Sequence, residues 1–209
     1  MKKQCYKFQL FKLPYAYDAL EPYIDTKTMK LHHDRHLKTY TDKLNAALAQ
    51  CPELHSWSLE RLLCSGNNIP MKIRNDVRNN GGGVYNHIYY FMGMSPDAEH
   101  VPGGELLDKI CRTFGSWDEF KKKFKTCALD VFGSGYLWLV TDRRGCLKIV
   151  QTANQDSPIS KGFCPIIVID VWEHAYYLKH YNDRASYIDD WFAVLNAEFA
   201  EDNYIAGLC

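Results

Sequence analysis

One turn-rich stretch near the middle of the chain separates two halves of different character, and this limits the folds that the chain can adopt. Residues 94–104 (MSPDAEHVPGG) form the only long segment rich in turn residues. Helical periodicity prevails before this stretch, whereas helical and β-rich segments are mixed after it. We therefore expect an α+β protein with an N-terminal helical hairpin domain at 1–95, a linker at 96–104, and a C-terminal α/β domain with a small three-stranded antiparallel sheet at 105–209.

Two long helices are expected in the N-terminal half. The first spans residues 25–50, and one of its faces carries, at four-residue intervals, His32, His36, Tyr40, Leu44 and Leu48. The second spans about 71–93 and contains three consecutive glycines at 81–83. Each glycine costs about 1 kcal/mol inside a helix, so propensity alone predicts a break at this run.

The C-terminal half alternates between helical and β-rich patterns. A capping box, Ser116-x-x-Glu119, marks the start of its second helix. The patterns predict helices at 105–114, 116–132 and 185–201, and strands at 135–141, 146–152 and 165–171.

The charge balance and the hydrophobic pattern exclude several classes of protein. The chain has 25 Lys and Arg against 25 Asp and Glu, so a nucleic-acid or membrane-surface partner is not expected. Apolar runs such as 136–140 and 166–169 are far shorter than the roughly 20 residues that span a bilayer. Polar residues interrupt any signal-peptide core before Pro14, so we expect a cytoplasmic location.

The eight cysteines do not form a recognisable disulfide or zinc framework. No two of them have the C-x-x-C spacing, and several lie in apolar stretches. We expect reduced, buried thiols that pack as small apolar groups, with Cys209 as a candidate reactive thiol.

The sharpest local signal is the segment 170–177 (DVWEHAYY), which directly follows a predicted strand. Asp170 and His174 can converge on one centre if the chain turns between them, and neither group is stable when buried without a partner. An ion pair or a helix cap explains such a pair more often. His32, His36 and His87 lie on other predicted elements, however, and a shared metal ion would explain them all.

A site of imidazoles and one carboxylate suits iron, manganese or zinc better than calcium or magnesium. The sequence contains no H-E-x-x-H helix and no nucleophile elbow, which are typical of hydrolases. The residues therefore indicate a redox or Lewis-acid metal site.

The chain resembles the iron/manganese superoxide dismutases over nearly its whole length. The resemblance rests on motifs in both halves, namely Leu13-Pro14-Tyr15, residues 19–22 (ALEP), 31–36 (LHHDRH) with Tyr40, Asn86-His87, 132–135 (FGSG), 153–156 (ANQD) and 170–177. It implies disproportionation of superoxide into dioxygen and hydrogen peroxide by one manganese or iron ion per subunit. It also implies that the second helix continues through the glycine run.

The resemblance assigns roles to particular side chains. The implied metal ligands are His32, His87, Asp170 and His174. Tyr40 and His36 are implied at the mouth of the substrate channel. Arg35 and Arg184 are candidates for attracting the superoxide anion, and solvated surface charge is the alternative for Arg35. A homo-oligomer, either a dimer or a tetramer, is implied, in which Glu173 contacts the partner's His174 and Tyr177 contacts the partner's His36.

The resemblance also indicates the metal and several departures from the usual pattern. In manganese types the residue four positions before the second His ligand is Gly, and the glutamine near the metal comes from the Asn-Gln-Asp segment. This chain has the same pattern, with Gly83 before His87 and Gln155 in that segment. Gln155 would then contact the solvent at the metal. The departures are Leu37 and Val84 in place of His, and Phe91 and Tyr136 in place of Trp.

Two other functions use the same ligands. A non-redox metallohydrolase would remain active with zinc, whereas a silent relative would bind metal without turnover. Metal analysis of the protein from its native host, coupled to a dismutation assay, separates these alternatives from a superoxide dismutase.

Overall fold

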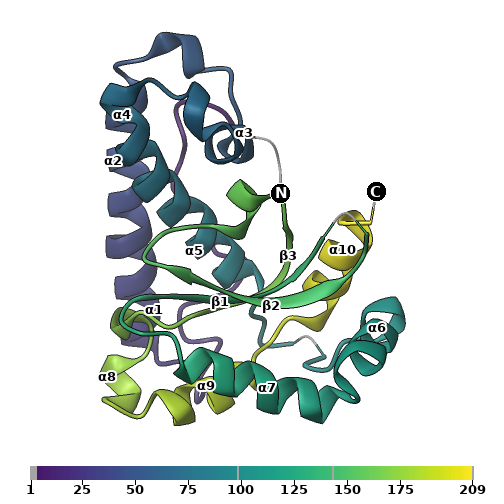
Figure 1. The fold of residues 1–209 in the computed structure, drawn as a ribbon. Helices are drawn as coiled ribbons and strands as arrows, with labels where there is room; N and C mark the ends of the chain where they lie inside the picture. The colour runs from purple at the N-terminus through teal and green to yellow at the C-terminus, as the bar shows by residue number, and fades with distance from the viewer. Residues whose placement is uncertain (1–3, 98, 143, 209) are drawn as a thin grey trace.

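The computed structural model describes residues 4–97, 99–142 and 144–208 (Figure 1). Long helices from the N-terminal half stand along one side of the molecule, and a three-stranded sheet with its own helices makes up the rest. The predicted α+β class, with a helical hairpin before an α/β part, is confirmed.

Helices outnumber strands in the described part of the chain. The α-helices are α1 (Thr26–Leu31), α2 (Lys38–Leu48), α3 (Leu59–Cys64), α4 (Met71–Asp76), α5 (Gly82–Met92), α6 (Gly104–Phe114), α7 (Trp117–Leu129), α8 (Tyr177–His180), α9 (Arg184–Phe192) and α10 (Ala197–Ala206). The strands are β1 (Gly135–Thr141), β2 (Leu147–Ala153) and β3 (Cys164–Asp170).

The first predicted helix is present and contains a π-helical turn. Asp25 caps its start by accepting a hydrogen bond from the Thr28 backbone N–H at 2.9 Å. The π-helical turn at His32–Leu37 joins α1 to α2 without a break. Such turns are rare and occur frequently at functional sites.

The second predicted helix also runs without a break, so the break predicted from propensity at 81–83 is wrong. A π-helical turn, Val77–Gly81, joins α4 to α5, and Gly82 and Gly83 begin α5. A Cβ on Gly82 would lie 2.0 Å from the carbonyl oxygen of Gln155, and one on Gly83 would lie 2.5 Å from the Tyr40 ring. Close approach of other segments therefore requires glycine here, against its low helix propensity.

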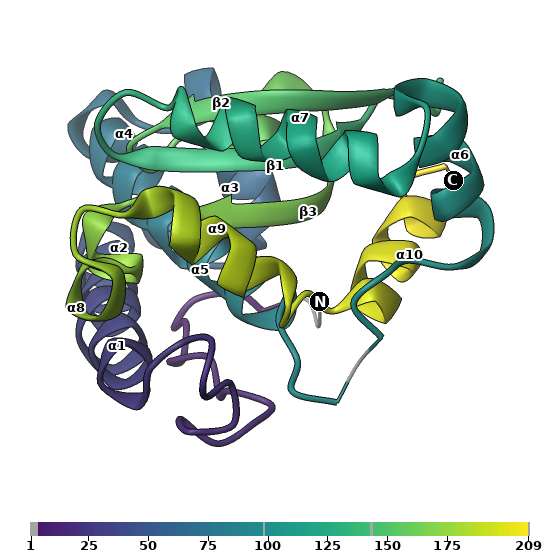
Figure 2. The same cartoon turned by 90° about the horizontal axis from the view of Figure 1, so that it is seen from below.

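The three strands form an antiparallel sheet in the order β2-β1-β3. All seven residues of the central strand β1 are buried, because α7 packs on β1 and β2 while α5 and α10 pack on β3 (Figure 2). Tyr136 on β1 pairs with Asp170, the last residue of β3. The sheet thereby holds these two side-chain positions next to each other.

The predicted final helix at 185–201 is wrong, because the chain turns between α9 and α10. Residues in this turn pair with the segment after α5. Ser95 donates to the carbonyl of Val194, and Met94 forms a bridge with Leu195. Asn196 then caps α10 by accepting from the Phe199 N–H at 3.0 Å.

Helix α7 begins at the predicted capping box but ends at Leu129, before the predicted residue 132.

The cysteines are free thiols throughout the described residues, as expected, but most are not buried. Only Cys51 among these seven is buried, while Cys64 and Cys146 are exposed. Cys209 lies outside the described residues.

Within the described residues, no helix is both long enough and apolar enough to cross a membrane.

We expect Gly82→Ala to lower the free energy of unfolding, although alanine is the better helix former. The new methyl group would overlap the Gln155 carbonyl oxygen, and overpacking of this kind costs about 1–3 kcal/mol. Urea unfolding measures the change. Gly81→Ala is the matched control, since its nearest neighbour is a flexible Leu63 methyl group at 3.3 Å. An equal loss of stability in both variants would contradict the close-approach explanation.

Candidate metal centre

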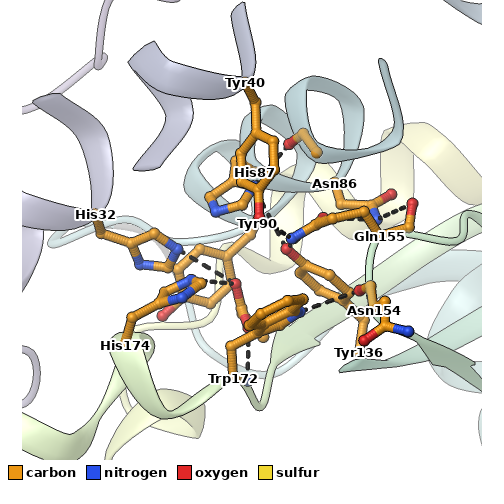
Figure 3. A network of polar contacts seen from close by, with 12 residues as sticks. His32, Tyr40, Asn86, His87, Tyr90, Tyr136, Asn154, Gln155, Trp172 and His174 are labelled. Carbon is orange, nitrogen blue, oxygen red and sulfur yellow. Dashed lines mark hydrogen bonds and ion pairs between the residues drawn. The ribbon is translucent and has the colours of Figure 1, made fainter. Parts of the chain in front are cut away.

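Four buried or nearly buried side chains from both halves of the chain meet at one point. His32 lies in the π-helical turn after α1, His87 on α5, Asp170 at the end of β3, and His174 in the 3-10 turn Glu173–Ala175. One possible ligand atom from each of the four lies within 4.8 Å of all the others. Figure 3 shows the imidazole rings of His32, His87 and His174 gathered at this point. The four residues predicted as ligands are therefore brought together.

The atoms that face this point lack hydrogen-bond partners. Nε2 of His32, His87 and His174 and Oδ2 of Asp170 are buried, and within the described residues none of them makes a hydrogen bond. A buried polar group without a partner costs about 1–3 kcal/mol. A single cation at the centre would satisfy all four atoms, so these residues fit a metal ion.

The spacing of the ligand atoms also fits a metal ion. Oδ2 of Asp170 lies 3.2 Å from Nε2 of His32 and 3.5 Å from Nε2 of His174. Metal–ligand bonds of about 2.1 Å at angles of 90–120° separate neighbouring ligand atoms by about 3.0–3.6 Å. Three imidazoles and one carboxylate suit manganese, iron or zinc.

The protonation states favour metal binding. Burial lowers the pKa of His32 to about 4 and lowers the pKa of His87 well below its ordinary value. Burial alone would raise the pKa of the Asp170 carboxyl, but its contacts with His174 and His32 lower that pKa overall. At neutral pH His32 and His87 are therefore neutral imidazoles and Asp170 is an ionised carboxylate, the forms that bind metals.

Hydrogen bonds behind the ligands set their orientation. The Nδ1–H of His87 donates to the carbonyl of Gly83 at 2.6 Å, which directs Nε2 toward the centre. Oδ1 of Asp170 accepts from the backbone N–H of Trp172 at 2.8 Å, which leaves Oδ2 facing the centre. The Tyr187 hydroxyl donates to the backbone carbonyl of Asp170 at 2.8 Å and anchors the end of β3.

A polar network lies beside His87 (Figure 3). The amide Nε2 of Gln155 donates to the Tyr40 hydroxyl at 3.1 Å, and the Tyr136 hydroxyl donates to Gln155 Oε1 at 3.0 Å. Asn86 Nδ2 contacts the main-chain carbonyls of Gln155 and Asp156 at 3.3 and 3.2 Å. Tyr40 and Gln155, both predicted site residues, are thus joined directly.

Of the other predicted site residues, only His36 touches the ligands. Its ring stacks on the ring of His174 with centroids 4.0 Å apart. Glu173 and Tyr177 are exposed, and so is Arg35. The Arg184 guanidinium is tied to the main chain, donating to the carbonyls of Val131 at 2.8 Å and Gly133 at 3.4 Å.

Three residues of the site were not assigned a role from the sequence: Asn86, Tyr136 and Tyr187. A signal existed for Asn86, which is a polar residue within the apolar stretch of α5. The sequence marked Tyr136 only as a departure from the usual Trp, and Tyr187 resembles an ordinary core aromatic. Only the fold brings their hydroxyls to Gln155 and Asp170.

Both halves of the chain match family models. Residues 7–95 match the α-hairpin domain of the iron/manganese superoxide dismutases, and residues 102–203 match the C-terminal domain of the same family.

Curated relatives match over most of the chain. The chain is 48% identical to a manganese superoxide dismutase of Listeria monocytogenes over 199 residues, covering 95% of this chain and 98% of that protein. It is 46% identical to the manganese superoxide dismutase 1 of Leptolyngbya boryana over 198 residues, covering 94% of this chain and 80% of that protein.

Proposed function

This chain belongs to the iron/manganese superoxide dismutase family, and from that membership we propose which of its residues carry out the reaction. The protein is an oxidoreductase that converts superoxide to dioxygen and hydrogen peroxide with one bound manganese or iron ion. One superoxide loses an electron and leaves as dioxygen, while a second gains an electron and two protons. The bound ion supplies the one-electron acceptor and donor for this exchange.

We propose that His32, His87, Asp170 and His174 hold the ion. The observation that carries this assignment is the set of four buried ligand atoms without hydrogen-bond partners, all within 4.8 Å of one another. The single carboxylate contributes one negative charge, which partly offsets the charge of the ion in either valence. The backbone contacts of His87 and Asp170 support the assignment because they leave the ligand atoms free.

Tyr40, Gln155 and His36 are proposed to serve the proton transfers. The Tyr40 oxygen accepts a hydrogen bond from Gln155, so its own O–H remains free to donate elsewhere. Burial raises the pKa of Tyr40, which keeps the phenol protonated at neutral pH. His36 is half-buried, and its ring stacks on the ring of the proposed ligand His174.

Manganese is the proposed preferred metal. The glutamine of the site comes from Gln155, as in the manganese pattern, and it occupies space next to α5. Position 83 has no room for a side chain, because a Cβ there would lie 2.5 Å from the Tyr40 ring. This geometry favours the arrangement in which residue 83 is Gly and Gln155 supplies the amide.

Arg35 and Arg184 are proposed to attract the superoxide anion, since the chain has no net charge to do so. The hydrogen bonds of Arg184 to main-chain carbonyls hold its positive charge in a fixed position. Arg35 is exposed in the π-helical turn that also carries His32 and His36.

A homodimer built on the metal site is also proposed. Glu173 and Tyr177 flank His174 and are exposed, with Tyr177 accessible over 48% of its surface. Large apolar side chains around them are exposed as well, among them Leu31, Leu178 and Tyr181. Contacts of Glu173 with the partner's His174 and of Tyr177 with the partner's His36 would cover this face, which is the kind of patch that marks an interface.

We further propose a cytoplasmic location and a division of the chain into 1–95, a linker at 96–104, and 105–209. Free thiols at the seven described cysteines support the cytoplasmic location, because reduced cysteines are typical of the cytoplasm. The separate family matches at 7–95 and 102–203 support the division of the chain into two domains.

The ligand assignment is tested by His174→Ala, with metal content and superoxide dismutation measured on the same preparation. Loss of one of four ligands should remove the ion and the activity together. His180→Ala is the matched control, because His180 lies in the same segment but contacts Asp190 instead of the centre. Retention of metal or of activity by His174→Ala would refute the assignment.

Zinc loading of the unmodified protein distinguishes a superoxide dismutase from the two other functions, a metallohydrolase and a silent relative. Zinc binds the same ligands but cannot accept an electron, so the zinc form should bind one ion per chain and show no dismutation. A zinc form that hydrolyses esters or phosphates would favour a metallohydrolase, and an inactive manganese form would favour a silent relative.

Gln155→Ala should retain the ion and change turnover. The Gln155 amide contacts Tyr40 but no ligand atom, so metal affinity should change little. The kcat should fall about 10-fold or more, as it does when other residues that surround metal ligands are replaced. Pulse radiolysis measures kcat, and elemental analysis checks the metal. Kinetics equal to those of the unmodified protein would remove Gln155 from the mechanism.

Glu173→Ala should weaken the proposed dimer. Removing the carboxylate would leave the partner's His174 without its contact, so sedimentation velocity should show dissociation at higher protein concentration than for the unmodified chain. Glu53→Ala, an exposed residue at the tip of the helical hairpin, is the control. Identical dissociation curves for both variants would exclude Glu173 from the interface.

A further inference from the structure

We infer that a cavity between α3, α4 and the 3-10 turn Pro158–Lys161 binds the phosphate group of a small molecule. The cavity has a volume of about 330 Å³, and none of the four proposed metal ligands lines it. Figure 1 shows α3 and α4 at the opposite end of the molecule from α8, which carries part of the proposed dimer face. Binding at this cavity would therefore be separate from both the metal centre and that face.

The charged side chains of the cavity are mostly positive. Arg74, Arg78 and Lys161 line it together with one carboxylate, that of Asp156. Asp156 is paired with Arg78, whose Nη2 lies 2.7 Å from Oδ2, whereas neither Arg74 nor Lys161 forms an ion pair within the described residues. Two positive charges are therefore left to attract an anion to a chain that has no net charge.

Both guanidinium groups are held in place before a ligand binds. Arg74 donates from Nε and Nη2 to the Ile69 carbonyl at 3.1 and 3.0 Å, and from Nη2 to the Asn67 carbonyl at 3.1 Å. Arg78 donates from Nε and Nη2 to the two carboxylate oxygens of Asp156, each at 2.7 Å. These bonds leave Nη1 of each arginine for another acceptor. Guanidinium groups are typical phosphate ligands, and fixed ones lose little side-chain entropy on binding.

A buried hydroxyl in the wall of the cavity lacks a partner. Ser157 lines the cavity and is only 4% exposed, and its Oγ makes no hydrogen bond within the described residues. The neighbouring Ser160 donates its own hydroxyl to the Ser157 carbonyl at 2.8 Å, which fixes the backbone of this turn. A buried hydroxyl without a partner is unfavourable. A phosphate oxygen at this wall would supply the acceptor that Ser157 lacks.

The remaining wall of the cavity is apolar and leaves room for more than a phosphate ion. It is formed by Leu62 and Leu63 of α3, by Ile69, and by Val77 at the end of α4. The volume falls at the lower end of the range of roughly 300–1,000 Å³ that is usual for small-molecule sites. We therefore expect a phosphate ester with an apolar or aromatic portion, which would lie against the leucines while its phosphate meets the cations.

Isothermal titration calorimetry on the manganese-loaded protein at low salt tests the site with AMP, inorganic phosphate and adenosine. AMP should saturate one site per chain, and adenosine should bind at least 10-fold more weakly because it lacks the phosphate. Tighter binding of AMP than of inorganic phosphate would identify an ester as the ligand, and equal binding would identify free phosphate. Absence of saturable binding by both AMP and phosphate, or equal affinity for AMP and adenosine, would overturn the inference.

Charge reversal separates this cavity from a general attraction of anions. Lys161 is exposed and makes no ion pair within the described residues, so Lys161→Glu should fold normally and bind AMP at least 10-fold more weakly. Lys123→Glu is the matched control, because Lys123 is an exposed lysine on α7, outside the cavity, and its replacement changes the net charge equally. Its affinity for AMP should change less than twofold. Equal weakening in the two variants would refute the cavity as the site.

Ser157→Ala tests the buried hydroxyl. Its Tm should not fall, since the hydroxyl has no partner to lose among the described residues, whereas its affinity for AMP should fall about 10-fold. Dismutation by the manganese-loaded Lys161→Glu variant should equal that of the unmodified protein. If Ser157→Ala and Lys161→Glu both bind AMP as tightly as the unmodified chain, the ligand binds elsewhere and the inference is wrong.

Discussion

Four buried polar atoms that find no hydrogen-bond partner among the described residues are the constraint on which the rest of this structure depends. Each such group costs about 1–3 kcal/mol, so the arrangement persists only because the surrounding fold enforces it or an ion satisfies it. Packed helices hold His32 and His87, while the end of β3 and the turn after it hold Asp170 and His174. The hydrogen bonds to Gly83 and Trp172 use the other atoms of His87 and Asp170, which leaves one ligand atom of each for the centre.

The parts of the fold that depend on local sequence could be predicted. Periodicity and the Asp25 cap located the first helix, Ser116 located the start of α7, and alternation of turn and β-rich segments located all three strands. The Asp170 and His174 pair was visible because two polar groups directly follow an apolar strand. Spacing alone did not choose among the remaining histidines, and the family resemblance was needed to select His32 and His87 over His36.

The parts that depend on contacts between distant segments could not be predicted from local patterns. Propensity placed a break at 81–83 because it could not account for the Gln155 carbonyl and the Tyr40 ring, which require glycine there. The single helix expected at 185–201 was wrong for a similar reason, since the turn at Asn196 is held by residues 93–95. Tyr136 carried no local sign of its hydrogen bond, which exists only because β1 lies beside the turn that bears Gln155.

The fit between Gly82 and the main chain of Gln155 has a consequence for how this protein can be recombined. Gly82 belongs to the helical half and Gln155 to the sheet-bearing half. The contact has no room for a side chain at position 82, because a Cβ there would lie 2.0 Å from the Gln155 carbonyl oxygen. A chimera that joins the helical half of one homologue to the sheet-bearing half of another will assemble only where both parents share this contact. The two halves of this chain are therefore matched at this contact, although each corresponds to a separate family module.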